Sequence, residues 1–162
     1  MNENRIGKEV VDAAVRVHRE LGPGLLETVY EVVLAKELER RGLRVERQVP
    51  VPIIYGGLRF EEGFRADIIV EGKVILELKS VEQVSKVHAK QVFTYLKLKG
   101  LKLGFLLNFG GNLMKDGIER IANGLPEETL GVLASLREAQ VESGVRSPQD
   151  SILNANLTSN EL

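Results

Sequence analysis

The sequence contains no cysteine, so the protein has neither disulfide bonds nor thiolate ligands for a metal ion. It also lacks an apolar run long enough to span a membrane, and its first ten residues, MNENRIGKEV, lack the hydrophobic stretch of a signal peptide. Neither sign of charge dominates, because 22 basic and 23 acidic residues give a net charge of -1. These absences predict a cytoplasmic protein without a membrane segment, whose phosphate-binding surface, if it has one, is local.

Length and composition indicate one soluble domain with a sizeable core. The chain has 162 residues, of which 43% are hydrophobic and 28% charged. Its three tyrosines and five phenylalanines all lie between Tyr30 and Phe109, which places the folded core in that span. We therefore expect a domain over residues 1–125. Residues 126–162 are expected to form a weakly attached helix, Glu127 to Val141, and a disordered tail rich in serine and asparagine.

The stretch from Phe64 to Ser80, FRADIIVEGKVILELKS, predicts a β-hairpin. Residues 68–70 lead into a turn at Glu71-Gly72 and residues 74–76 lead out of it, and both triplets are wholly apolar. The exceptions to this apolar pattern are Asp67, Glu77 and Lys79. Side chains two apart in a strand share a face, so Glu77 and Lys79 project together at the end of the second strand.

The length of the turn decides whether Asp67 joins them. A two-residue loop would set Asp67 opposite Leu76, with its carboxylate on the other face. A three-residue loop from Val70 to Gly72, with Gly72 in a left-handed conformation, would pair Asp67 with Ile75 and put its carboxylate diagonal to Glu77. We expect the three-residue loop, because it keeps the apolar side chains of both strands on the core side.

Two carboxylates and a lysine at one strand end outline a metal site. Carboxylate oxygens are the ligands that suit Mg²⁺ or Mn²⁺. Each residue also has an ordinary interpretation, since an acid and a lysine two apart are common and Asp67 could cap a turn or pair with Arg65. The compatible placement of Asp67, Glu77 and Lys79 favours the metal site.

The remaining pattern predicts an α/β fold. Helices are expected over residues 6–21, 26–41 and 85–99, strands over 43–55 and 103–108, and a short helix over 116–123. Pro50 and Pro52 favour an edge strand or a bulge within 43–55. The order is helix, three strands, helix, strand, preceded by an extra helix. A central mixed sheet flanked by helices is the expected architecture.

The helix from Ser85 to Lys99 is expected to place one arc beside the metal site. A helical wheel puts four residues in one arc, Val92, Leu96, Ala89 and Phe93, and three in the next arc, His88, Gln91 and Tyr95. That second arc could border the site, although Tyr95 has an alternative interpretation as a residue at the edge of the core. A stripe of lysines is expected to face solvent: Lys86, Lys90 and Lys97.

These blocks resemble a known family. The segment PGLLETVY carries Gly24, Glu27 and Tyr30 at the spacing that names the GxxExxY proteins. The segments FRAD (64–67), ELK (77–79), QVFTYL (91–96) and Asn108-Phe109 look like other blocks of that family, and the resemblance covers about residues 6–125. The family is similar to the PD-(D/E)XK nucleases, whose restriction-endonuclease-like core has the order αβββαβ.

The resemblance implies roles for five residues. Asp67 and Glu77 would bind Mg²⁺, and Glu27 would add a third carboxylate from the first core helix. Lys79 would contact the attacking water or the scissile phosphate, and Gln91 would match a glutamine found in some branches of the superfamily. Without the resemblance, Glu27 would be interpreted as an acid favoured by the helix dipole. The motif departs from the pattern at Ala66, where a proline often precedes the aspartate.

The sequence thus predicts a metal-dependent nuclease acting on nucleic acid, with DNA or RNA left open. The alternative is a binding module for nucleic acid or protein that keeps the fold without the activity, because folds outlive functions. The intact set of Asp67, Glu77 and Lys79 favours the nuclease. A homodimer is also left open.

Overall fold

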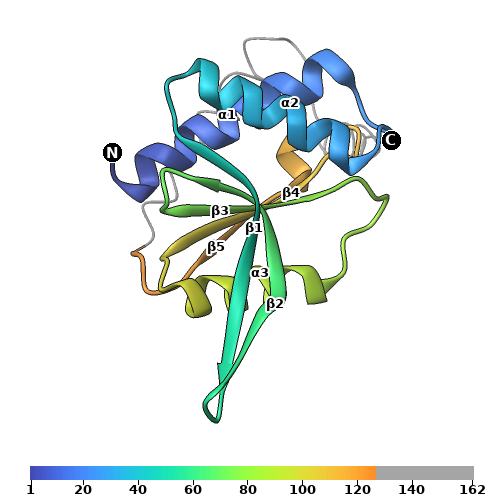
Figure 1. Cartoon of the computed structure of the whole chain (residues 1–162). Coiled ribbons are helices and arrows are strands. Elements are labelled where there is room, and N and C mark those ends of the chain that lie inside the picture. The colour runs from blue at the N-terminus through green and yellow to red at the C-terminus, as the bar shows by residue number, and fades with distance from the viewer. Residues whose placement is uncertain (127–162) are drawn as a thin grey trace, which may run out of the picture. The chain divides into compact units, whose positions relative to one another are not determined.

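A computed structural model describes residues 1–126 of the chain, in which a five-stranded sheet has helices on both faces (Figure 1). The expected weakly attached helix and tail of residues 126–162 lie outside the described residues, apart from Pro126. The elements follow one another as α1 (Glu3–Leu21), α2 (Glu27–Arg40), β1 (Val45–Tyr55), β2 (Leu58–Val70), β3 (Val74–Lys79), α3 (Lys86–Lys99), β4 (Leu103–Asn108), the short 3₁₀ helix η1 (Met114–Gly117) and β5 (Ile118–Ala122). No helix in residues 1–126 is long and apolar enough to cross a membrane.

Helices α1 and α2 lie together on one face of the sheet (Figure 1). Helix α1 begins after Asn2, whose side chain accepts a hydrogen bond from the Arg5 backbone N–H at 2.9 Å. It ends at Leu21, and the capping residue Gly22 has a positive φ of 71°. A stripe of small and branched apolar residues is buried along α1: Ile6, Val10, Val11, Ala13, Ala14 and Val17. Burial of this stripe holds the helix on the sheet.

The sheet has the order β1-β2-β3-β4-β5 and is mixed. Strands β3 and β4 are parallel, with α3 as the crossover between them, and the other neighbouring pairs are antiparallel. Strand β1 lies at one edge, and its pairing with β2 shifts register between Val51 and Ile53. The prolines at positions 50 and 52 are thus in an edge strand with a bulge, which confirms the expectation, because proline cannot donate to a ladder on both sides.

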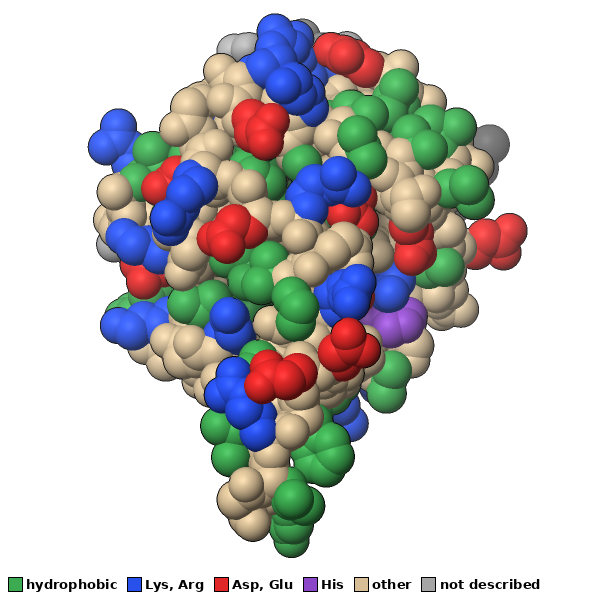
Figure 2. Space-filling model, viewed as in Figure 1, with side chains coloured by type: hydrophobic (Ala, Val, Ile, Leu, Met, Phe, Trp, Pro, Cys, Tyr) green, Lys and Arg blue, Asp and Glu red, His purple; other side chains and the backbone are tan. Residues whose placement is uncertain are grey.

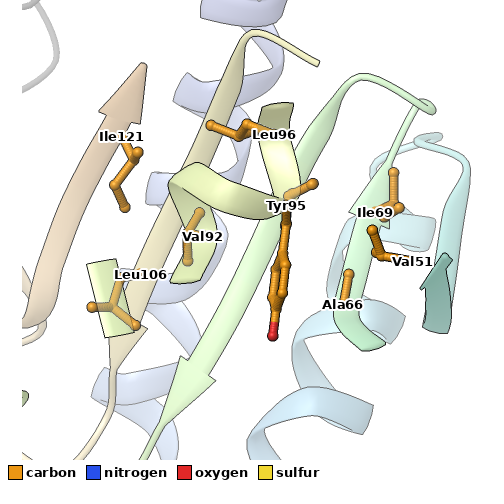
Figure 3. Close-up of a cluster of buried hydrophobic side chains, with 9 residues drawn as sticks. Val51, Ala66, Ile69, Val92, Tyr95, Leu96, Leu106 and Ile121 are labelled. Carbon is orange, nitrogen blue, oxygen red and sulfur yellow. The ribbon is translucent and has the colours of Figure 1, made fainter. Parts of the chain in front are cut away.

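The second face of the sheet packs on α3 (Figure 3). The cluster there consists of Val51, Ala66, Ile69, Ile75, Val92, Tyr95, Leu96, Leu106 and Ile121. Helix α3 approaches closely at Gly104, where a Cβ would lie 2.7 Å from Val92 Cγ1. The expected orientation of α3 is confirmed for Val92 and Leu96, which are buried, and for the three lysines of the solvent stripe, which are exposed. It is wrong for Phe93, which is 39% exposed and has Lys97 Nζ 5.6 Å from its ring centroid.

The expected short helix over residues 116–123 is wrong. The chain forms η1 and then strand β5, which pairs antiparallel with β4 from Leu107↔Ile118 to Leu103↔Ala122. Strand β4 is buried along its whole length, so its backbone groups at this edge need hydrogen-bond partners. The need to pair β4 decides the conformation of this segment.

The expected register of the β2–β3 hairpin is wrong by two residues. Val70 pairs with Val74, Ile69 with Ile75 and Ile68 with Leu76, so the loop is Glu71 to Lys73. A three-residue loop and a positive φ at Gly72, 63°, are as expected. Glu71 is held by Arg44 at the start of β1: its N–H donates to Arg44 O at 2.8 Å, and its carboxylate accepts from Arg44 N at 2.5 Å. These contacts fix Glu71 in the loop.

Candidate active site

Strand β3 carries two charged side chains at its end, although its other side chains are apolar. Glu77 is buried, with 7% of its surface exposed, and Lys79 is half-buried. The Lys79 Nζ lies 3.5 Å from Glu77 Oε1. Glu77 Oε2 is buried and has no hydrogen-bond partner among the described residues. A buried carboxylate oxygen without a partner is costly, so this atom marks a place where a ligand would be stabilising.

Asp67 of β2 lies across from this strand end. It precedes Ile68, the partner of Leu76, and its Oδ2 accepts a hydrogen bond from the Leu78 backbone N–H at 2.8 Å. The corrected register therefore brings Asp67 next to Glu77 along the paired strands, closer than the expected pairing with Ile75 would have done. Burial raises the pKa of Asp67, and the Leu78 N–H opposes that rise by stabilising the charged form.

The pKa of Glu77 is raised to about 7. The largest cause is burial, which disfavours the charged form, and the negative charge of Asp67 acts in the same direction. The ammonium of Lys79 opposes both by favouring the carboxylate. Burial and the charge of Asp67 together outweigh Lys79, so the pKa of Glu77 lies near neutral pH, as expected of a group at a functional site.

Glu27 reaches the same strand end from α2. It is the first residue of the helix, and its Oε2 accepts a hydrogen bond from the Ser80 backbone N–H at 3.3 Å. Its charge contributes to the raised pKa values of Asp67 and Glu77. Beside Glu27 lies an open cleft of about 760 Å³, lined by Pro23 to Thr28, Ser80 to Glu82 and Gly110. Of the three acids Glu27, Asp67 and Glu77, Glu27 is the one that lines this cleft.

The first turns of α2 also bring Glu31 to the site, and the sequence argument missed this residue. Glu31 is 4% exposed and accepts hydrogen bonds from Arg47 Nε at 3.0 Å and Gln48 Nε2 at 2.8 Å. Its negative charge raises the pKa of Asp67. The signal was its position four residues after Glu27, which puts both acids on one side of a helix.

Tyr95 of α3 comes closer to the carboxylates than its interpretation as a core-edge residue suggested. It is 4% exposed, and its hydroxyl points away from the apolar cluster (Figure 3). Burial raises the pKa of Tyr95 to about 12, and the charges of Glu77 and Asp67 add to the rise. Gln91, one turn earlier, is half-buried, and within residues 1–126 no hydrogen bond joins it to the other site residues. The structure thus brings the tyrosine to the site and leaves the glutamine without a contact to it.

The described residues do not include a ready-made set of three metal ligands. Within the part of the chain that the structure describes, no group of three acidic, histidine or cysteine side chains is placed to hold an ion. The strongest pair of oxygen donors consists of Asp67 and Glu77, because both are largely buried, both have raised pKa values, and Glu77 Oε2 has no hydrogen bond.

Comparison with known proteins identifies one family. The family model described as the PD-(D/E)XK nuclease superfamily matches residues 4–121. The crystal structure of SSO0001 is similar with a TM-score of 0.43 and 19% sequence identity, over 87% of this chain and 76% of that chain. None of the curated proteins matches the sequence.

Proposed function

Because this chain belongs to the PD-(D/E)XK nuclease superfamily, we propose that it is a metal-dependent nuclease that hydrolyses phosphodiester bonds in nucleic acid. The observation that carries the proposal is Glu77, a buried carboxylate with a pKa of about 7, one oxygen without a hydrogen bond, and both Asp67 and Lys79 beside it. If Glu77 had no function, an apolar residue at this position would make the protein more stable.

We further propose that the chain belongs to the GxxExxY branch of this superfamily, because the three residues of that motif act together here. The Tyr30 ring stacks on Phe109 at 4.4 Å between centroids, and its hydroxyl donates to Gly22 O and accepts from Leu25 N. Tyr30 thereby fixes the loop before α2, where Gly24 has a φ of 97°. This loop positions Glu27 at the end of β3.

The residues present fit a divalent cation. Asp67 and Glu77 supply carboxylate oxygens, which Mg²⁺ and Mn²⁺ prefer, and Glu27 adds negative charge from the side of the open cleft. When bound, such an ion polarises a phosphoryl oxygen and lowers the pKa of water. Asp67 and Glu77 would hold the ion, which would give Glu77 Oε2 the partner that it lacks among the described residues.

Lys79 is the residue of the chain that would act on the substrate. Its half-buried ammonium lies 3.5 Å from Glu77 Oε1 at the end of β3, where it would stabilise negative charge on the scissile phosphate or orient the attacking water. Gln91 and the Tyr95 hydroxyl, both on α3, would complete the wall that orients that water. Glu27 is proposed to position the loop at Ser80 and to contribute to cation binding.

The test is a cleavage assay with labelled single- and double-stranded DNA and RNA in Mg²⁺ or Mn²⁺. We expect cleavage of at least one of the four substrates, and a loss of at least about 100-fold in Glu77→Ala and Asp67→Asn. Glu119→Gln, an exposed acid on β5, is the control and should keep full activity. Binding of nucleic acid without cleavage by the wild type would favour the alternative, a non-catalytic module. Cleavage that persists in Glu77→Ala would indicate a contaminating nuclease.

A further inference from the structure

The β1–β2 hairpin extends beyond the rest of the sheet (Figure 1). Pairing between β2 and β3 stops at Ile68↔Leu76, whereas pairing between β1 and β2 continues to Tyr55↔Leu58. In the described part of the chain, no backbone hydrogen bond joins residues 58–66 to any segment other than β1. A two-stranded ribbon is marginally stable in water, and its free edge is a template for another strand.

The outer part of this ribbon is apolar and exposed. Ile54, Tyr55, Leu58 and Phe60 are 65%, 78%, 61% and 53% exposed. Tyr55 lies opposite Leu58 and Ile53 opposite Phe60, so these two pairs share one face of the ribbon. Ile54 pairs with Arg59 on the other face. The space-filling view shows hydrophobic side chains gathered at the projecting end (Figure 2). An exposed apolar face next to a free strand edge is typical of an interaction surface.

The charges of the ribbon decide between two kinds of partner. Residues 53–63, which include the β2 side of the bulge, carry Arg59 but also Glu61 and Glu62, so the surface has no positive surplus to attract a phosphate backbone. The same charges are complementary to themselves. Arg59 and Glu61 flank Phe60 and pair with each other on one face of β2.

We propose that two copies of this chain pair through the free edges of β2, antiparallel, about a two-fold axis at Phe60. With Phe60 opposite Phe60 of the second copy, Arg59 lies opposite Glu61 of that copy, and Glu61 opposite its Arg59. An axis at Arg59 would place two arginines opposite each other, and an axis at Glu61 would place two glutamates opposite each other. The two ribbons then form a four-stranded sheet, in which the edge is paired and Phe60 is covered. The pairing does not depend on the nuclease proposal.

Exchange of the charges tests this pairing in the full-length protein. We expect a dimer of the wild type by sedimentation equilibrium. Arg59→Glu alone and Glu61→Arg alone should each raise the dimer Kd about tenfold, because each places like charges opposite one another at two symmetric positions. The double variant should recover the wild-type Kd. An equimolar mixture of the two single variants should form a heterodimer more tightly than either variant alone. Lys86→Glu, an exposed charge on α3, should leave the Kd unchanged.

Cross-linking tests the position of the axis, because the natural chain has no cysteine. Under mild oxidation Phe60→Cys should form a disulfide-linked dimer, since residues opposite each other on the axis bring their Cβ atoms within reach. Ile54→Cys is the matched control. It is on the same tip and at 65% is more exposed than Phe60 at 53%, but it belongs to β1, which lies away from the proposed contact. The Ile54→Cys variant should therefore stay monomeric on a denaturing gel.

Three results would overturn the proposal. A wild type that is monomeric at all concentrations tested would do so, as would a dimer whose Kd is unchanged in both single charge variants. Equal cross-linking of Phe60→Cys and Ile54→Cys would show random collision.

Fluorescence anisotropy with a labelled DNA duplex tests nucleic acid as the competing partner. A monomeric wild type whose DNA affinity falls in Phe60→Asp, with an unchanged melting temperature, would assign the apolar tip to nucleic acid instead.

Discussion

Glu77 makes the site pH-dependent at the scale of a single residue. In the unfolded chain its pKa is near 4.5, and in the folded protein it is about 7. Between these values the folded protein holds a proton that the unfolded chain has lost, so stability falls as pH rises. The cost of ionised Glu77 is fully absent below pH 4.5 and fully present above pH 7, where it amounts to about 3 kcal/mol.

The substitution Glu77→Gln removes this dependence. In the presence of a chelator we expect the variant to be more stable than the wild type at pH 8, with a difference that shrinks towards pH 4.5. Denaturant unfolding at several pH values measures it. Glu119→Gln, at an exposed position, corrects for general charge effects. A variant less stable than the wild type at pH 8 would mean that Glu77 forms a stabilising ion pair with Lys79 and that its cost is overestimated.

Gln91 is a second test at the residue scale. It is half-buried and, among the described residues, makes no hydrogen bond that holds the fold. We therefore expect Gln91→Ala to lower nuclease activity while the melting temperature changes by no more than about 1 °C. Activity assays and thermal unfolding of the same preparation measure both effects. Loss of stability in proportion to activity would show that Gln91 supports the packing of α3 and does not orient water.

At the scale of elements, the β2–β3 hairpin depends on its loop. Gly72 has a φ of 63°, a conformation in which a Cβ is strained. A Cβ at this position would also lie 3.0 Å from the guanidinium of Arg44, which can move aside. The strain therefore comes from the backbone and not from crowding.

We expect Gly72→Val to destabilise the protein by about 1 to 2 kcal/mol, because β-branched residues adopt this conformation poorly. Gly72→Asn should cost less, since asparagine tolerates the left-handed region. Chemical denaturation gives both values. Equal losses in the two variants would locate the effect in the contact with Arg44. Since the loop sets the register that brings Asp67 to Glu77, we also expect nuclease activity of Gly72→Val to fall.

At the scale of the whole molecule, metal binding and folding are linked. An ion that binds only the folded state stabilises it by RT ln(1 + [L]/Kd), so Mg²⁺ or Mn²⁺ at ten times Kd should contribute about 1.4 kcal/mol. That corresponds to a rise in melting temperature of about 3 to 5 °C. Asp67→Asn and Glu77→Gln should abolish the rise, because each removes one of the two proposed ligands.

Thermal unfolding with a chelator and with excess metal measures this link without any substrate. Glu46→Gln, an exposed acid on β1, serves as a control that should keep the full response. A wild type that melts at one temperature in both conditions, with Asp67→Asn and Glu77→Gln both less stable, would assign these carboxylates to ordinary structural contacts.

The sequence by itself determined which elements form the core and which strand end carries the charged group. Apolar runs of period two, helical stripes and the prolines of β1 are local signals, and they gave the αβββαβ order and the edge position of β1. The isolated charges Asp67, Glu77 and Lys79 were visible because they interrupt such runs. Local patterns are sufficient to predict these features, because burial of one face of a helix or strand imposes a periodic apolar pattern on its own sequence.

Only the tertiary structure decided the register, the fifth strand and the neighbours of the site. Arg44 holds Glu71 from 27 positions away in the sequence, which sets the loop and brings Asp67 beside Glu77. The buried edge of β4 makes residues 118–122 a strand. Glu31 and Tyr95 come to the carboxylates from two helices on opposite faces of the sheet. Each of these outcomes depends on a partner distant in the sequence, and no local pattern encodes which distant group will be there.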